Sequence, residues 1–128
     1  MKRQTGHVLV VDDDPGTCQV LAALLSTEGY NVVAAGDGLE ALHLLRTVRH
    51  REIEAPCLVL LDLNMPRLGG SEFRRAQLGD PTVSNVPVAI LSGATNAAER
   101  GMALGAVATV TKPIDFEMLL DVVRRYCL

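Results

Sequence analysis

Short aliphatic runs alternate along this chain with longer segments in which apolar residues recur at helical spacing. Five runs predict strands, at residues 7–11, 31–35, 57–62, 86–91 and 107–111. Three of them contain the unbroken apolar stretches VLVV, LVLL and VAIL, without the alternation expected of a half-exposed strand. Unbroken runs of this kind favour strands buried on both faces, as in a parallel sheet covered by helices.

The segment after the first run predicts an amphipathic helix. Asp14 is a favoured N-cap, Pro15 is a favoured first helical residue, and Gly29 is a typical C-terminal stop. Four aliphatic residues form the expected buried face of this helix: Val20, Leu21, Leu24 and Leu25.

Four further helices are predicted between and after the remaining runs. Asp37 and Glu40 have the spacing of a capping box at the start of the second helix. The residues expected to be buried on that helix are Leu39, Ala41, Leu42 and Leu45. Shorter helices are expected at 71–78 and 96–104, and Asp115 is the predicted cap of the last helix. The last helix has an expected buried stripe of Phe116, Leu119, Leu120 and Val123.

A strand–helix unit repeated five times predicts an α/β fold, because parallel strands need helical crossovers between them. The leading candidate is the flavodoxin-like doubly wound (βα)5 fold, with sheet order 2-1-3-4-5 and helices on both faces. We expect one domain over residues 1–128, with a core from about 6 to 127, and no output domain on this chain.

Composition and charge narrow the classes of protein. No apolar run approaches the roughly 20 residues that a membrane span needs, and the stretch at 8–11 is too short for a signal peptide. A cytoplasmic protein without membrane contact is therefore expected. The net charge of −3 argues against a non-specific nucleic-acid binder, which usually has a basic face. Direct nucleic-acid binding is not expected.

The three cysteines, Cys18, Cys57 and Cys127, form no CxxC pair and have no histidine nearby at metal-ligand spacing. Because their number is odd, a disulfide framework is not expected. We interpret them as small buried hydrophobic side chains. The histidines at 7, 43 and 50 likewise have no ligand spacing and are interpreted as ordinary surface or core residues.

Polar residues gather where the predicted strands end. Asp12 and Asp13 follow the first strand, Asp62 ends the third, Ser92 follows the fourth and Lys112 follows the fifth. In an open α/β sheet the binding crevice lies outside the carboxyl ends of the strands, at the point where strand order reverses. The predicted order makes strands one and three neighbours at that point, so the three carboxylates should converge in one pocket.

A cluster of carboxylates repels itself unless a cation lies within it. Mg²⁺ suits such a site, because it binds carboxylates, waters and phosphate oxygens. Lys112 adds a fixed positive charge and Ser92 a hydroxyl, which suits an anionic group on Asp62. An aspartate can act as the nucleophile toward phosphorus and form an aspartyl phosphate.

Each of these residues also has an ordinary structural interpretation. Asp12 and Asp13 could be caps or solvated charges, Ser92 could mark a turn before Gly93, and Lys112 could be a surface lysine. Their joint position at matching strand ends favours a site.

The chain resembles the receiver domains of bacterial response regulators over nearly its whole length. The resemblance rests on VLVVDDDP at 8–15, LVLLDLNMP at 58–66 with Gly70, LSGA at 91–94 and TKP at 111–113. The order and combination of these motifs are highly specific, although each alone would be weak.

The resemblance implies a role for each site residue. Asp62 would be the phospho-acceptor, Asp13 would bind Mg²⁺ directly, and Asp12 would bind it directly or through water. The backbone carbonyl of Asn64 would be a further metal ligand, and Mn²⁺ is the alternative ion. Ser92 would bind a phosphoryl oxygen, and Lys112 would pair with the phosphate.

The implied partners are those of a two-component phosphorelay. The donor would be a phosphohistidine on a sensor histidine kinase or a histidine phosphotransfer protein, and the output would be phosphorylation-dependent binding of a protein partner that the sequence does not identify. The chain would catalyse its own Mg²⁺-dependent phosphorylation and dephosphorylation at Asp62 and would not be a turnover enzyme.

Two features depart from the family pattern. Thr109 stands where receivers commonly have Tyr or Phe, so the usual inward turn of a ring behind the residue equivalent to Ser92 is not available. We hypothesise that switching uses backbone shifts at 92–95 and in the fourth helix. The link at 47–55 is longer than is usual and locally basic; it could bind an acidic partner, but a solvated helix end is the favoured interpretation.

Two other functions compete with a phosphorylated switch. A Mg²⁺-dependent phosphatase or phosphotransferase of similar topology usually has a second Asp two residues after the nucleophile, where this chain has Asn64. A receiver-like interaction module that is never phosphorylated usually lacks the acidic pair or the lysine, and both are present here. The phosphorylated switch is therefore favoured.

Overall fold

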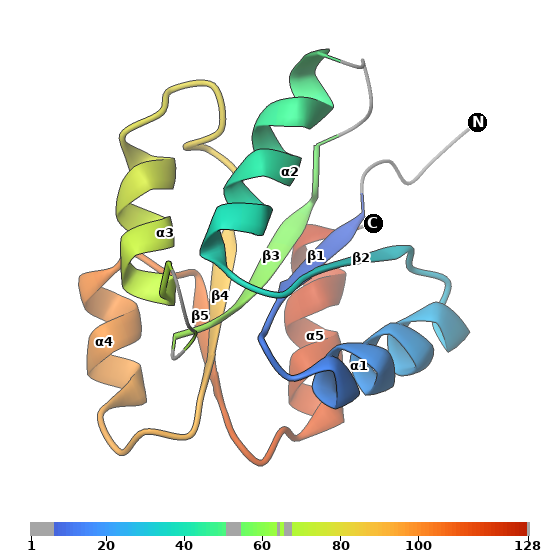
Figure 1. Cartoon of the computed structure of the whole chain (residues 1–128). Helices are drawn as coiled ribbons and strands as arrows, with labels where there is room; N and C mark the ends of the chain where they lie inside the picture. The colour runs from blue at the N-terminus through green and yellow to red at the C-terminus, as the bar shows by residue number, and fades with distance from the viewer. Residues whose placement is uncertain (1–6, 51–54, 64, 66–67, 128) are drawn as a thin grey trace.

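The computed structural model describes residues 7–50, 55–63, 65 and 68–127 and has one parallel sheet flanked by helices (Figure 1). The strands are β1 (Val8–Val11), β2 (Val32–Ala35), β3 (Leu58–Asp62), β4 (Val88–Ser92) and β5 (Ala108–Thr111). The helices are α1 (Pro15–Thr27), α2 (Gly38–His50), α3 (Gly70–Leu78), α4 (Ala97–Ala103) and α5 (Phe116–Tyr126). The strand order is β2-β1-β3-β4-β5, which confirms the predicted fold.

The strands begin one or two residues later than the apolar runs predicted. The shift is clearest in β4, because Val86 donates its backbone N–H to Val83 in a turn and Pro87 has no N–H to donate. At the other end β4 continues through Ser92, which is in register with Thr111. Ser92 is therefore held by the sheet.

The sheet is buried on both faces, as the unbroken apolar runs predicted. Every residue of β1, β3 and β4 is buried. Alternate residues face two separate apolar clusters: Val8, Val10, Leu58 and Leu60 pack with α1 and α5, whereas Leu9, Val11, Val59 and Leu61 pack with α2 and α3. The helices thus cover both faces of a parallel sheet.

The predicted helix caps are confirmed. Asp14 accepts the N–H of Gly16 at 3.0 Å, and Asp115 accepts those of Glu117 and Met118. Asp37 accepts the N–H of Glu40 at 2.9 Å, as in a capping box, while the Glu40 carboxylate accepts the N–H of Gly36. These caps fix where the chain leaves each strand end.

The predicted buried faces of α1 and α2 were partly wrong. Val20 is 57% exposed, Leu24 is 37% exposed and Leu39 is 51% exposed. The buried stripe of α1 consists of Cys18, Leu21 and Leu25, which are spaced three and four residues apart. Val20 and Leu24 lie on the neighbouring stripe, which faces a surface groove instead of the sheet.

The cysteine prediction was also wrong for two of the three residues. Cys57 and Cys127 form a disulfide between residues 70 apart in sequence, with their Cα atoms 5.3 Å apart. Cys57 immediately precedes β3, Cys127 follows α5, and both pack in the cluster that α1 and α5 share. Cys18 is a free, buried thiol, as predicted.

A buried polar network joins α3 to the end of α4. The guanidinium of Arg74, on α3, donates to the carbonyls of Leu104 and Gly105 at 2.8 and 3.1 Å and to Gln77 at 2.6 Å. Gln77 is fully buried and donates to the carbonyls of Val83 and Val86. Since buried carbonyls need donors, these two side chains fix α4 and the turn before β4 against α3.

Among the described residues, no helix is both long enough and apolar enough to span a membrane.

Candidate functional site

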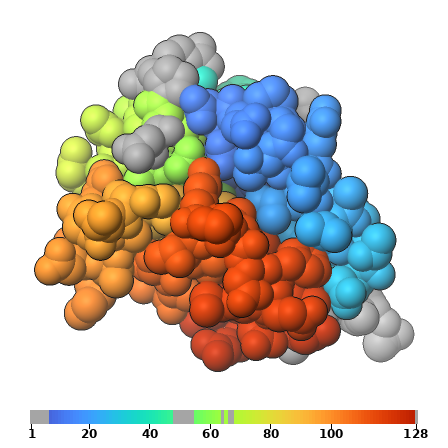
Figure 2. Space-filling view, turned by 90° about the horizontal axis from the view of Figure 1, so that it is seen from below, coloured from blue at the N-terminus to red at the C-terminus, as the bar shows by residue number. Residues whose placement is uncertain are grey.

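Polar residues lie at the edge of the sheet where the strands end. Figure 2 views the molecule from that end of the strands, with the segments distinguished by their colour along the chain. Asp12 and Asp13 follow β1, Asp62 ends β3, Ser92 ends β4 and Lys112 follows β5. Strands β1 and β3 pair directly, with Val11 opposite Leu61. This register places Asp12 and Asp13 next to Asp62, as the predicted strand order required.

The three carboxylates form a compact cluster. One oxygen of each of Asp12, Asp13 and Asp62 lies within 4.8 Å of the other two. Asp12 and Asp62 are buried, at 2% and 6% exposure, whereas Asp13 is exposed. An all-oxygen set with one side open to water fits Mg²⁺, which keeps several waters when it binds carboxylates.

Lys112 supplies positive charge inside this cluster. Its Nζ lies 3.2 Å from Oδ2 of Asp12 and 3.5 Å from Oδ1 of Asp62. Partial burial of the ammonium opposes its charge, but attraction to Asp62 and then Asp12 outweighs that effect and raises the pKa of Lys112. The lysine is therefore charged at neutral pH and touches two of the three acids.

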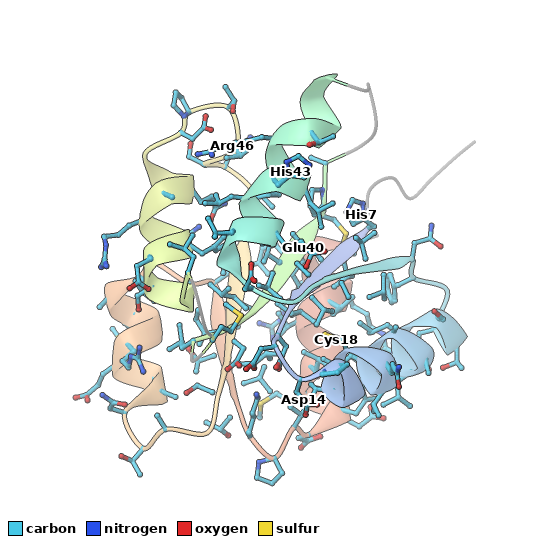
Figure 3. The ribbon with its side chains drawn as sticks, viewed as in Figure 1. His7, Asp14, Cys18, Glu40, His43 and Arg46 are labelled. Carbon is cyan, nitrogen blue, oxygen red and sulfur yellow. A yellow bond between two sulfur atoms is a disulfide. The ribbon has the colours of Figure 1, made fainter. Side chains whose placement is uncertain are left out.

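Asp14 lies beside the cluster at the start of α1 and acts as the predicted helix cap (Figure 3). Hydrogen bonds from Thr17 and then from Gly16 lower the pKa of its exposed carboxylate. The N–H of Asp14 in turn donates to Oδ1 of Asp12 at 3.0 Å. The turn into α1 thus orients Asp12, because one of its oxygens is held by this N–H and the other by Lys112.

Ser92 is buried at 1% exposure and sits at the end of β4 beside the start of the β5–α5 loop. Its carbonyl accepts the backbone N–H of Lys112 at 2.9 Å, and its hydroxyl oxygen accepts the N–H of Ala94 at 3.1 Å. The Ser92 hydroxyl therefore stabilises a turn, as its ordinary structural interpretation predicted. It also lies at the end of β4, on the same edge of the sheet as the acid cluster.

Gly70 fixes α3 against the end of β3. A Cβ at this position would lie 2.6 Å from the carbonyl oxygen of Asp62 and 2.7 Å from Cα of Leu63. The N–H of Gly70 also donates to the carbonyl of Leu63 at 3.1 Å. Only glycine allows this approach, which explains physically why the LVLLDLNMP motif is followed by Gly70.

Thr109 lies beneath α4, a contact that the sequence did not indicate. A Cβ on Gly101 would overlap Oγ1 of Thr109 and would come within 3.8 Å of Ile90. The helix backbone at Gly101 thus packs directly against the side chain of Thr109. Arg74, which donates to the carbonyls of Leu104 and Gly105, was likewise missed, because an Arg in a polar helix gives no sequence signal of burial.

Two predictions fall outside the described residues. The proposed carbonyl ligand Asn64 is one, and residues 51–54 of the basic link are the other. Within the described part, Arg46 pairs with Asp80 at 3.1 Å and the exposed His43 contacts Thr47 (Figure 3). The interpretation of His43 as an ordinary surface residue agrees with this contact. His7 is half-buried, and burial lowers its pKa.

An apolar groove borders the site. It lies between α1 and the β5–α5 loop, next to Lys112, and the side chains that line it are Asp14, Gly16, Thr17, Val20, Leu21, Leu24, Lys112, Pro113, Ile114 and Phe116. The exposed residues Val20 and Leu24 belong to this surface.

A fold with this strand order and an acid cluster paired to a lysine defines the receiver class of signalling domains. The family model of the response regulator receiver domain matches residues 8–124. The chain belongs to that family, as its motifs predicted.

Individual relatives agree with this assignment. The chain is 36% identical over 92% of its length to the DNA-binding response regulator MtrA of Mycolicibacterium smegmatis, and 34% identical over 94% to the response regulator PleD of Caulobacter vibrioides. It spans 49% of MtrA and 26% of PleD, so about half or less of these relatives.

Solved structures show the same fold. The chemotaxis response regulator CheY4 of Vibrio cholerae has a TM-score of 0.81 at 31% identity, covering 95% of this chain and 98% of that one. A response regulator receiver protein from Pseudomonas putida has a TM-score of 0.82 at 28% identity, covering 97% of this chain and 99% of that one.

Proposed function

We propose that this receiver accepts a phosphoryl group on Asp62 from a phosphohistidine of a sensor kinase or phosphotransfer protein. Asp12, Asp13 and Asp62 would hold Mg²⁺, with the carbonyl of Asn64 as a further ligand, and the phosphorylated form would bind a protein partner. The observation that carries the proposal is the position of Lys112, whose ammonium contacts both Asp12 and Asp62 in a cluster of three acids.

In the proposed transfer, a carboxylate oxygen of Asp62 attacks phosphorus while the P–N bond to the donor imidazole breaks. The electron pair of that bond stays on the imidazole nitrogen. With the other nitrogen of the imidazole ring protonated before the transfer, the products are an aspartyl phosphate and a neutral histidine. Asp62 suits this role because it ends a fully buried strand, which holds its carboxylate in a fixed position.

The residues around Asp62 would stabilise the transferring group. Lys112 can move its charge from the carboxylates to a phosphoryl oxygen, and the Ser92 hydroxyl can donate to another. When bound, Mg²⁺ supplies positive charge to the oxygens of the transferring phosphoryl group. Asp13 is exposed and leaves one side of the cluster open to the donor.

The donor protein would cover the apolar groove beside the site. Val20 and Leu24 are exposed there, next to Lys112 at the entrance to the acids. A helix that presents a phosphohistidine to Asp62 would bury both side chains, which supports a protein donor.

The phosphorylated state would be read through α4. Thr109 has no aromatic ring that could turn inward on phosphorylation. The backbone of α4 packs against Thr109, and α4 follows the turn in which the Ser92 hydroxyl accepts the N–H of Ala94. A shift of Ser92 toward a phosphate would therefore act on the 92–95 turn and on α4. Beryllofluoride should move amide resonances within residues 92–112, and unchanged resonances there would refute this route.

Phosphorylation is tested by incubating the protein with Mg²⁺ and phosphoramidate and measuring intact mass. We expect one added phosphoryl group on the wild type and on the surface control Asp121→Asn, which replaces an exposed acid of α5. Asp62→Asn and chelator treatment should each abolish the addition. Labelling that persists in both would exclude the proposed site.

A further inference from the structure

The disulfide lies at the edge of the sheet opposite the acid cluster. Cys57 is the residue before β3, and Asp62 is the last residue of that strand. At about 3.3 Å per residue, the two are separated by roughly 16 Å of extended chain. Cys127 terminates α5, so the bond fastens the end of this helix to the start of the strand that holds Asp62.

The two half-cystines differ in exposure. Cys127 is 1% exposed and packs in the apolar cluster, whereas Cys57 is only partly buried at the rim of that cluster. Sγ of Cys57 lies 3.4 Å from the carbonyl oxygen of His7, which can accept the S–H of the reduced form. A small reagent can therefore reach Cys57 more easily than Cys127.

Cys18 differs from both as a reactive group. The residue is only 8% exposed, and its Sγ donates to the carbonyl oxygen of Asp12 at 3.4 Å. A buried thiol that reagents do not reach is inert in exchange. Cys18 is thus an internal control for reactivity within the same chain.

We propose that Cys57 and Cys127 form a reversible thiol–disulfide exchange site whose substrates are low-molecular-weight disulfides, with Cys57 as the entry sulfur. In the oxidising direction the Cys57 thiolate attacks one sulfur of oxidised glutathione, forming a mixed disulfide and releasing one glutathione thiolate. The Cys127 thiolate then attacks Sγ of Cys57 and releases the second glutathione. The protein loses two electrons and two protons, and the small disulfide becomes two thiols.

Exchange at this site would control the end of α5. In the oxidised form the last turn is tied covalently to the sheet. In the reduced form the last turn would keep its helix hydrogen bonds, its apolar packing, the 3.7 Å ion pair of Arg124 with Glu28 and the hydrogen bond from Cys127 N–H to the carbonyl of Val123, but it would have no covalent tie to the sheet. Reduction should therefore speed amide hydrogen exchange at 123–127 by about tenfold or more and leave residues 8–12 unchanged.

The direct test traps the entry sulfur. Reduced protein is freed of reductant, incubated with oxidised glutathione, quenched with N-ethylmaleimide and measured by intact mass and peptide mapping. The masses of the wild type and of Cys18→Ala should each fall by two hydrogens, because the Cys57–Cys127 disulfide forms. Cys127→Ser should stop with one glutathionyl group on Cys57, and Cys57→Ser should react at Cys127 at least about tenfold more slowly.

Three results would overturn the proposal. In the first, maleimide still labels both Cys57 and Cys127 of the wild type after treatment with oxidised glutathione. In the second, Cys57→Ser and Cys127→Ser react with oxidised glutathione at equal rates. The third result needs no variant. It is a wild-type time course in which peptide mapping finds the transient glutathionyl group on Cys127 or Cys18 instead of Cys57. Circular dichroism of each variant checks that its fold is retained.

Discussion

The Nζ atom of Lys112 lies 3.2 Å from Oδ2 of Asp12, a residue 100 positions earlier in the chain. The fold creates this contact by placing β1 and β3 next to each other and β5 at the sheet edge. Because the same ammonium also contacts Asp62, one lysine partly neutralises two buried acids. The electrostatic balance of the site therefore depends on Lys112.

Lys112→Gln should reduce the rate of Asp62 phosphorylation by phosphoramidate by roughly 100-fold, because one stabilising charge is lost. The variant should also change how stability depends on pH. The pKa of Lys112 is raised above its ordinary value of 10.5 in the folded protein, so its charge stabilises the fold below that pH. This contribution is lost as pH rises through the folded pKa.

Urea unfolding of the wild type and of Lys112→Gln from pH 8 to pH 12 checks the direction of this pH dependence. The unfolding free energy of the wild type should fall relative to that of the variant as the pH approaches the upper end. A difference that stays constant, or that grows in favour of the wild type, would contradict the assigned interaction.

Gly70→Ala should lower the free energy of unfolding by about 1–3 kcal/mol, since its Cβ would meet the carbonyl of Asp62 and must displace α3 or the strand end. Gly79→Ala is the matched control at the other end of α3, where the nearest atom is 3.5 Å away. Its effect should stay within about 0.5 kcal/mol. Equal losses in urea titrations of the two variants would show that the close approach at Gly70 is not responsible.

The sequence was sufficient to predict the buried strands and the polar residues at their ends, because both depend on short local signals. The strand order was predicted from the doubly wound fold that five strand–helix units favour. Unbroken apolar runs identified buried parallel strands, and Asp12, Asp13, Asp62 and Lys112 follow directly from strand ends. Proximity of the acids then required only the order of β1 and β3.

Contacts between distant, weakly patterned residues could not be predicted in this way. Cys57 and Cys127 are 70 residues apart, and neither spacing nor an odd cysteine count indicates that they pair. Val20 and Leu24 have the spacing of a buried face, but the next stripe, beginning at Cys18, is the one that meets the sheet. Which of two adjacent stripes is buried depends on helix rotation, which periodicity alone does not fix.

Gly101→Ala should lower the free energy of unfolding by about 1–3 kcal/mol, because the added Cβ overlaps Oγ1 of Thr109. Thr109→Ala removes that oxygen, so the double variant should recover most of the loss. A double-mutant cycle from urea titrations measures this coupling, which should be at least about 1 kcal/mol. Additive effects of the two substitutions would mean that α4 does not rest on Thr109.

Gln77→Ala should lower the free energy of unfolding by about 3 kcal/mol, since it removes donors to two buried carbonyls and the acceptor for Arg74. Arg75→Ala, at an exposed position of the same helix, should change it by no more than about 0.5 kcal/mol. A loss at Gln77 no larger than at Arg75 would show that the network contributes nothing to stability.

The central claim is that Asp62 itself carries the phosphoryl group, and chemical trapping of the acceptor tests it most directly. Borohydride reduces an aspartyl phosphate to homoserine, which tandem mass spectrometry locates in the sequence. After treatment with Mg²⁺ and phosphoramidate, homoserine should be found at position 62 and be absent when chelator is added. Homoserine at position 12 or 13 instead, or none anywhere in protein that has gained a phosphoryl group, would contradict the account.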